Sequence, residues 1–113
     1  GSLSRSAASV AAEARIRWVL EQLALAFEQR DLDAARTYRN DLTVQERQWL
    51  EAGSNVTVSF EDVRVVANEA AGTVRCRRVV TGKLASGVVV REDRTVTMSL
   101  VRRPTGWVIT DVK

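Results

Sequence analysis

The feature that most constrains this chain is a change in the spacing of its apolar residues at Gly53. Before Gly53, apolar residues recur every three or four positions, which is the spacing of helices that bury one side. After Gly53, apolar and polar residues alternate, which is the pattern of strands with one buried face. Three helices followed by four strands predict an α+β domain whose helices pack on an antiparallel sheet.

The first helix is expected to be long, because apolar residues keep helical spacing from Ile16 to Phe27. Charged residues take its other side. Trp18 and Leu25 lie off the main apolar stripe and widen it. This helix therefore needs a second packing partner, either another helix or another subunit.

Local signals delimit two shorter helices. Asp31 is placed to cap the second, which carries Tyr38. The run from Thr43 to Glu46 is a capping box, in which the threonine hydroxyl and the glutamate carboxylate accept bonds from free amides at a helix start. The third helix should stop at Gly53, because glycine readily takes the left-handed conformation that follows a helix.

The first strand is expected to be bent. Its apolar positions change parity between Phe60 and Val63, so a β-bulge near Glu61 and Asp62 would keep one face buried. Such a bulge also curves the sheet.

The turns between the remaining strands set their register. A three-residue loop containing a glycine places Arg78 opposite Arg94. The turn at residues 103–106 then places Met98 opposite Asp111.

Composition excludes several classes of function. A chain of 113 residues, 45% apolar and 27% charged, matches one ordinary globular domain, and no apolar run approaches the roughly 18 residues of a membrane span. With Cys76 as its only cysteine and no histidine, it offers neither a disulfide nor a zinc site, so no metal or cofactor is expected. Acid–base chemistry would fall to carboxylates, Tyr38 or a lysine, which lowers the expectation of an enzyme.

Charge gives no sign of nucleic acid binding. The net charge is +3, and the basic residues are interspersed with acidic ones. The six aromatic residues do not interleave with a basic stripe, so no nucleic acid partner is expected.

The amino end has the composition of a tag and linker. Gly1-Ser2 is typical of a tag scar, and residues 1–14 as a whole are expected to be scar plus linker or helix start, before a single domain at 15–113. A targeting segment could have been trimmed away. The compartment is therefore unknown, with the cytoplasm favoured over an extracytoplasmic domain of a membrane-anchored protein.

Two segments carry a resemblance to a known superfamily. The first helix, with Trp18 and Phe27, runs into the acidic turn at 30–35, and the last strand begins Gly-Trp-Val-Ile at 106–109. Together with the order of the elements, over roughly residues 15–113, they resemble the nuclear-transport-factor-2-like superfamily, which includes the ketosteroid isomerase and SnoaL-like proteins. The resemblance implies a cystatin-like cone, in which the helices pack into the concavity of a curved four-stranded antiparallel sheet.

The resemblance also ranks the functions. Short members resemble assembly or ligand-binding modules appended to kinases, sigma factors and sensors. It implies a non-enzymatic accessory domain of a larger bacterial protein, which dimerises or binds a small ligand or peptide. The alternative is a small cofactor-free isomerase, dehydratase or hydrolase. The histidine-containing acid–base sets of many enzyme members are absent, so no catalytic residue is carried over.

Two charged residues in phase with the core define candidate sites. Arg78, with Arg94 opposite, is either an anion clamp at the mouth of the cone or a solvated charge beyond the helices. Asp111 is either a buried general base with Tyr38 as its partner, or exposed at a frayed strand end.

The candidate pocket combines these residues with aromatic and apolar side chains, and would suit a small hydrophobic or anionic ligand. Its members are Trp18, Tyr38, Trp49, Phe60, Arg78, Arg94, Met98 and Asp111. The alternative is that the aromatic residues simply fill the cone as core.

The outer face of the sheet is rich in hydroxyl and valine side chains, which suits a sheet-to-sheet contact in a homodimer. The alternative is strand propensity alone. The expected outer-face residues are Thr57, Ser59, Arg75, Arg77, Val79, Thr95, Thr97, Ser99, Val101, Val108, Thr110 and Val112.

Overall fold

The computed structural model describes residues 6–113, so the tag scar expected at Gly1-Ser2 lies outside the described residues. Three helices precede four strands, as the change of period predicts. The helices are α1 (Ala7–Gln29), α2 (Leu32–Tyr38) and α3 (Val44–Trp49), and the strands are β1 (Asn55–Ala67), β2 (Ala71–Lys83), β3 (Val89–Arg103) and β4 (Gly106–Val112).

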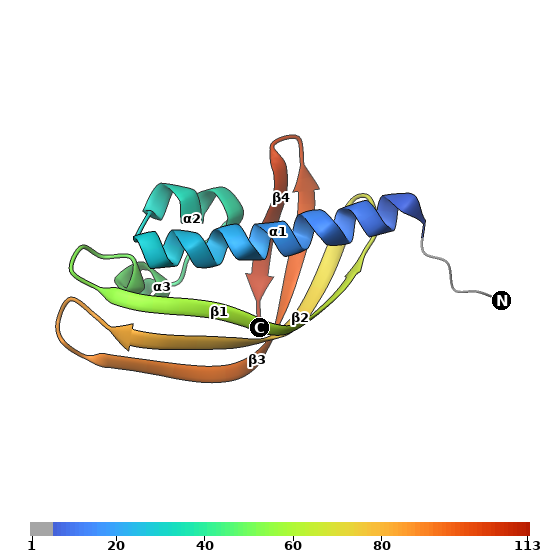
Figure 1. Ribbon diagram of the computed structural model, residues 1–113. Helices are drawn as coiled ribbons and strands as arrows, with labels where there is room; N and C mark the ends of the chain where they lie inside the picture. The colour runs from blue at the N-terminus through green and yellow to red at the C-terminus, as the bar shows by residue number, and fades with distance from the viewer. Residues whose placement is uncertain (1–5) are drawn as a thin grey trace.

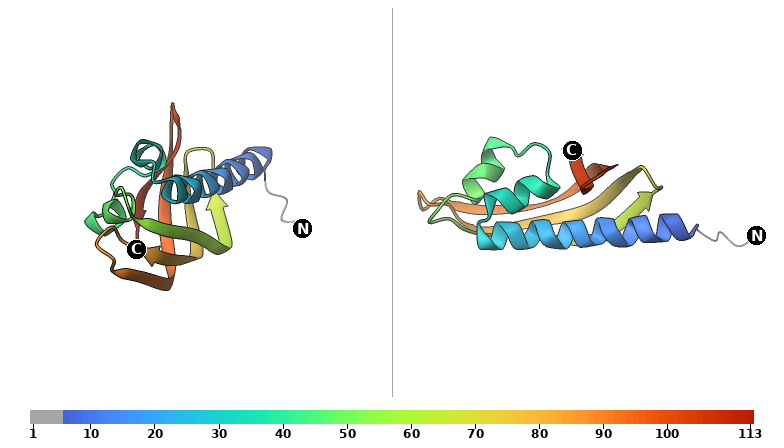
Figure 2. Two further views of the ribbon diagram at one scale, coloured as in Figure 1. Left: turned by 60° about the vertical axis from the view of Figure 1, so that its left-hand side comes forward. Right: turned by 90° about the horizontal axis from the view of Figure 1, so that it is seen from above.

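The four strands form one antiparallel sheet in the order β1-β2-β3-β4. All three helices lie on the same side of this sheet, and α1 runs across its concave face (Figures 1 and 2). The sheet therefore has an inner face covered by helices and an outer face that none of the helices of residues 6–113 covers. This is the predicted α+β architecture.

Helix α1 is longer than its apolar stripe. It begins at Ala7, where Ser6 accepts a hydrogen bond from the amide of Ser9 at 3.1 Å. Trp18 packs edge-on against Tyr38 of α2, with ring centroids 5.7 Å apart. The second packing partner expected for α1 is thus a helix of the same chain, although Leu25 remains exposed.

The predicted caps of the short helices are confirmed. Asp31 accepts a hydrogen bond from the amide of Ala34 at 3.0 Å. The side chain of Thr43 accepts from the amide of Glu46 at 3.1 Å, and the Glu46 carboxylate accepts from the amide of Thr43 at 3.0 Å. Both bonds of the capping box are therefore present.

The end predicted for the third helix is wrong. α3 stops at Trp49 rather than at Gly53, because the next amides, those of Leu50 and Glu51, bond to carbonyls three residues earlier and tighten the chain out of the helix. Gly53 has a φ of 88° but serves the turn into β1.

The bulge predicted in β1 is confirmed. The register with β2 shifts between Glu61 and Arg64, and Asp62 has a φ of 52°. Since an inserted residue bends its strand, this bulge contributes to the curvature of the sheet seen in Figure 2.

A second bulge, in β4, was not predicted. Ile109 pairs with Leu100 as expected, but Asp111 pairs with Ser99 and Val112 with Met98. The pairing of Met98 with Asp111 is wrong, because Thr110 is an extra residue that shifts the register by one. The shift moves Asp111 to the outer face and turns Val112, expected on the outer face, toward the core.

The core lies between the inner face of the sheet and the buried sides of the helices. Its largest fully buried residues are Trp49, Phe27, Ile16, Leu23, Met98, Leu100 and Ile109. Gly72 of β2 lets helix α1 approach the sheet closely, because a Cβ there would lie 2.7 Å from Cδ1 of Ile16. Within the described residues, no helix has the length and apolar content needed to cross a membrane.

Candidate functional site

The residues of the candidate pocket do not enclose one cavity. Trp49 and Met98 are fully buried in the core. Phe60 lines a groove of about 350 Å³ between α1 and β1, whereas Trp18 and Tyr38 line a separate cavity of about 130 Å³.

Asp111 is not the buried acid that its phase suggested. Its side chain is 51% exposed and its carboxylate lies 3.8 Å from Nζ of Lys113. The β4 bulge places it on the outer face, whereas Tyr38 packs against Trp18 on the helical side. The structure therefore does not bring Asp111 and Tyr38 together, and Asp111 is exposed, as in the second of its two alternatives.

Arg78 is buried, as its phase with the core residues indicates, but it is neither solvated nor an open clamp. Glu92 Oε1 accepts hydrogen bonds from its Nε at 3.0 Å and from its Nη2 at 2.7 Å. The same oxygen accepts from Nε of Arg94 at 3.2 Å. The arginine side chains of this cross-strand pair thus share one carboxylate, and Arg94 is the exposed end, with 53% of its side chain accessible.

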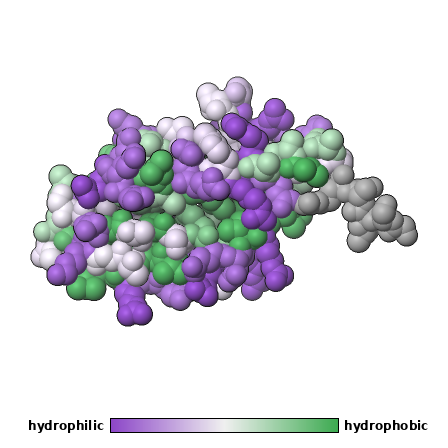
Figure 3. All heavy atoms as spheres, in the orientation of Figure 1, coloured by the Kyte–Doolittle hydropathy of each residue, from purple (hydrophilic) through white to green (hydrophobic). Residues whose placement is uncertain are grey.

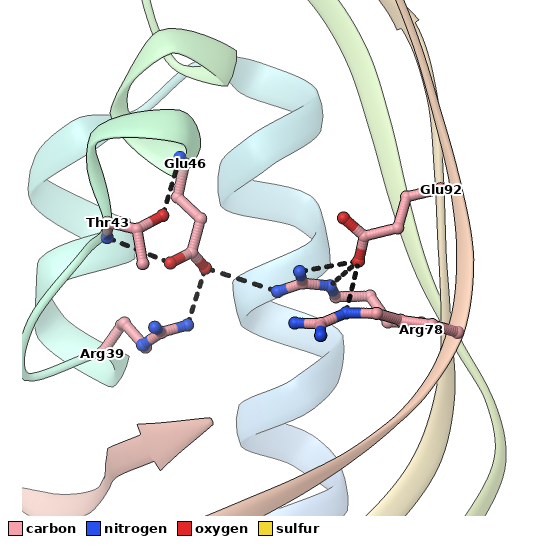
Figure 4. Close-up of polar contacts among 6 residues, drawn as sticks. Arg39, Thr43, Glu46, Arg78 and Glu92 are labelled. Atoms are coloured by element: carbon pink, nitrogen blue, oxygen red, sulfur yellow. Dashed lines mark hydrogen bonds and ion pairs between the residues drawn. The ribbon is translucent and has the colours of Figure 1, made fainter. Parts of the chain in front are cut away.

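On its buried side this network continues to Glu46, which is 3% exposed (Figure 4). Its Oε2 accepts a 2.6 Å hydrogen bond from Arg39 and lies 3.6 Å from Nη1 of Arg78. Its Oε1 holds the amide of Thr43 in the capping box. One carboxylate therefore joins the end of α2, the start of α3 and strand β2.

The network alternates in charge in the order Arg39, Glu46, Arg78, Glu92, Arg94. Because buried charges are tolerated only when they are paired and hydrogen-bonded, this alternation explains how two arginines and a glutamate remain in the core. We refer to these five residues as the ionic network.

Sequence reasoning identified Arg78 and Arg94 of this network but missed Arg39 and the central carboxylate, Glu46. Glu46 belongs to the capping box, and that local role explains a glutamate at this position without any tertiary contact. The remaining signal is its position three residues before Trp49, which places both on one face of α3.

The indole of Trp49 borders the ionic network. Cζ of Arg78 lies 5.4 Å from the centroid of its ring, and Phe27 packs edge-on at 5.8 Å. Nε1 of Trp49 is buried and has no acceptor among the described residues. Neither Trp49 nor Arg78 lines the groove at Phe60 or the cavity at Trp18 and Tyr38.

Cys76 is a buried thiol without a chemical partner. Burial raises its pKa, and the positive charge of Arg78 offsets part of this shift. The described residues contain no group of three or more histidine, cysteine or acidic side chains that could hold a metal ion.

The fold, rather than the sequence, connects this chain to known proteins. No protein-family model matches it, and a search of curated proteins found no match. Several solved structures do match over most of their length. A candidate dehydratase of the nuclear transport factor 2-like family from Streptomyces avermitilis has a TM-score of 0.72 at 12% identity, over 92% of this chain and 95% of that one.

Two further matches have different descriptions. A nuclear transport factor 2-like superfamily protein from Salmonella enterica has a TM-score of 0.72 at 11% identity, with 91% of this chain and 89% of that one covered. The association domain of CaMKII from Caenorhabditis elegans has a TM-score of 0.68 at 14% identity, with 95% and 97% covered. The chain therefore has the nuclear-transport-factor-2-like, cystatin-like fold. Identities this low establish the fold alone.

Proposed function

We propose that this domain is a non-enzymatic assembly module that forms a homodimer through the outer face of its sheet. The observation that carries the proposal is the distribution of the helices, which cover the inner face and leave the outer face open (Figure 1). On that face, uncharged side chains of β2 and β3 surround Arg75, which pairs with Thr97 in the register; they are Thr73, Thr95, Thr97, Ser99 and Val101. The hydroxyl and valine side chains of this surface lose less hydration energy than charged side chains when a second copy covers them.

One of the two arginines on this part of the outer face is already paired within the chain. Arg77 lies on the outer face and is held by Glu61 at 2.7 Å and by Asp93 at 3.0 Å. Because its charge is already compensated within the chain, covering it costs less than burying a lone arginine.

The interior gives weaker support to the enzymatic alternative. Its proposed base, Asp111, lies on the outer face, and Arg78 is occupied by Glu92 and Glu46. The similarity to an association domain adds a precedent for assembly within this fold.

Light scattering coupled to gel filtration tests the proposal. At tens of micromolar, the protein should elute as a dimer of about 25 kDa, twice the 12.5 kDa of one chain. Thr97→Arg should convert it to a monomer, since a two-fold contact would bring two new positive charges together. Thr37→Arg is the matched control, because Thr37 is exposed on α2, on the helical side.

A wild-type protein that stays monomeric at millimolar concentration would contradict the proposal. So would a dimer that Thr97→Arg leaves intact.

A further inference from the structure

A cleft on the helical side of the molecule is separate from the ionic network and from the outer face. It has a volume of about 460 Å³, within the range of small-molecule sites. Its walls are the first turns of α1, the turn between β1 and β2, and the β3–β4 hairpin, which rises beside α1 in Figure 1. Helix α1 lines the cleft with the small side chains of Ala8, Ala11 and Ala12 and with Arg15.

The charge of this cleft is unbalanced. Arg15, Arg102 and Arg103 line it, against the single carboxylate of Glu69. Among the described residues, no carboxylate lies within ion-pair distance of these three arginines. Arg77, by contrast, is paired on the outer face. Unpaired guanidinium groups around a concave wall concentrate positive potential there.

Backbone contacts fix the position of the lining arginines. The amide of Arg102 donates to the carbonyl of Ala70 at 2.9 Å, which ties the hairpin to the β1–β2 turn. At the hairpin tip, Arg103 pairs with Gly106 across a turn that contains the only proline of the chain. A held backbone reduces the entropy that a ligand must overcome when it orders these side chains.

A smaller cavity with aromatic walls, here called the aromatic recess, adjoins the cleft. The cavity of about 130 Å³ shares Arg15 and Trp107 with it and ends at Trp18 and Tyr38. Arg15 stacks over the Trp18 ring at 4.7 Å, so a cation stands where the two spaces meet. Hydrophilic and hydrophobic residues are interspersed over the face of the molecule shown in Figure 3.

We propose that this cleft binds a small organic oxyanion, in which a phosphate or carboxylate group is attached to an aromatic or apolar group. The guanidinium forks of Arg102 and Arg103 match the geometry of either oxyanion. The aromatic recess accommodates the apolar part. This site does not depend on assembly through the outer face, because it lies on the helical side of the sheet.

Amide NMR spectra of the uniformly labelled protein test the site. Titration with phenyl phosphate or with benzoate should shift the resonances of Gly106 and Trp107 in a saturable way, and the tighter of the two identifies the preferred oxyanion. Inorganic phosphate lacks the aromatic group and phenol lacks the oxyanion, so each should bind more weakly. Added salt should weaken binding, because the attraction is electrostatic.

The double variant R102Q/R103Q should weaken phenyl phosphate or benzoate binding by roughly tenfold or more, since it removes charged hydrogen-bond donors. Arg91→Gln is the matched control, because Arg91 is also an exposed arginine of β3 but does not line the cleft. Unchanged resonances elsewhere in the spectrum will show that the variants remain folded.

Three results would overturn the proposal: the absence of saturable shifts with both organic anions up to millimolar concentrations, equal binding by R102Q/R103Q, or an equal loss in Arg91→Gln.

Discussion

Cys76 shows how one residue can be dominated by its surroundings. The thiol is 2% exposed and pairs across the strands with Val96, which is fully buried. Burial disfavours the thiolate and raises the pKa of Cys76, while Arg78 lowers it in part. The residue therefore behaves as a small apolar side chain rather than as a nucleophile.

The raised pKa of Cys76 predicts a loss of stability in alkali. In the unfolded chain the thiol ionises at lower pH than in the folded protein, so its contribution to stability is present at neutral pH and falls as the pH rises through the folded pKa. Urea unfolding at about pH 7 and about pH 10 will measure this. Wild type should lose more stability over that range than Cys76→Ala, which lacks the thiol. Equal losses in the two proteins would contradict the assignment.

At the scale of elements, the ionic network joins two helix ends to the sheet. α2 and α3 have only seven and six residues, too short to be stable alone. Glu46 binds Arg39 beyond the end of α2 and faces Arg78 on β2. The orientation of both helices therefore depends on a charge contact as well as on apolar burial.

Replacing Glu46 with Gln should be strongly destabilising. Glutamine can still accept the capping bond. Arg39, however, would lose its counter-charge, and Arg78 would keep only Glu92 of its two carboxylate partners. Breaking a buried ion pair from one side costs about 3–5 kcal/mol of unfolding free energy. Glu61→Gln is the control, because the Glu61–Arg77 pair is about half exposed and such pairs contribute at most about 1 kcal/mol. Thermal or urea unfolding of both variants will measure the two losses of stability. Equal losses would show that the buried ion pairs contribute no more than the exposed Glu61–Arg77 pair.

The two bulges differ in how well the sequence predicts them. In β1, the change of parity is bounded by apolar residues on both sides, Phe60 and Val63, so it can be read directly. In β4, only Val112 follows the extra residue, and a single valine is too weak a signal to set a register. The sign of a register shift in β4 was instead Asp111, because without the shift this acidic residue would face the core.

The candidate site was less predictable than the fold, because its contacts are tertiary. The alternation of β2 correctly puts Arg78 with the core, and the loop before β3 correctly puts Arg94 opposite it. Which carboxylate reaches Arg78 depends on where α3 sits over the sheet. No local pattern specifies that position, so Glu46 was recognised only as a cap.

At the scale of the whole molecule, stability should be unevenly distributed. β2 and β3 are hydrogen-bonded on both sides within the sheet and carry fully buried residues such as Val74, Val80 and Val96. α2 is one short helix whose only fully buried residue is Ala35. Opening α2 exposes little apolar surface, whereas opening β2 requires the core to separate.

Native-state hydrogen exchange should therefore show its slowest amides in the middle of β2 and β3 and faster exchange in α2. Within α1, the buried amides around Leu20 should resemble the central strands more than α2 does. Protection of α2 equal to that of β2 would mean that the domain opens only as one unit. It would then contradict the graded distribution expected here.

The shared carboxylate of Glu46 also limits how this sequence can change over time. An apolar replacement of the whole network could be as stable as the present one. Reaching it would require changes at Glu46, Arg39 and Arg78 together, since a substitution at any one of them leaves an unpaired charge in the core. The three positions should therefore vary as a set. A related protein that keeps one of these charged residues should keep the other two, because variants that lack only one or two of them would be less stable.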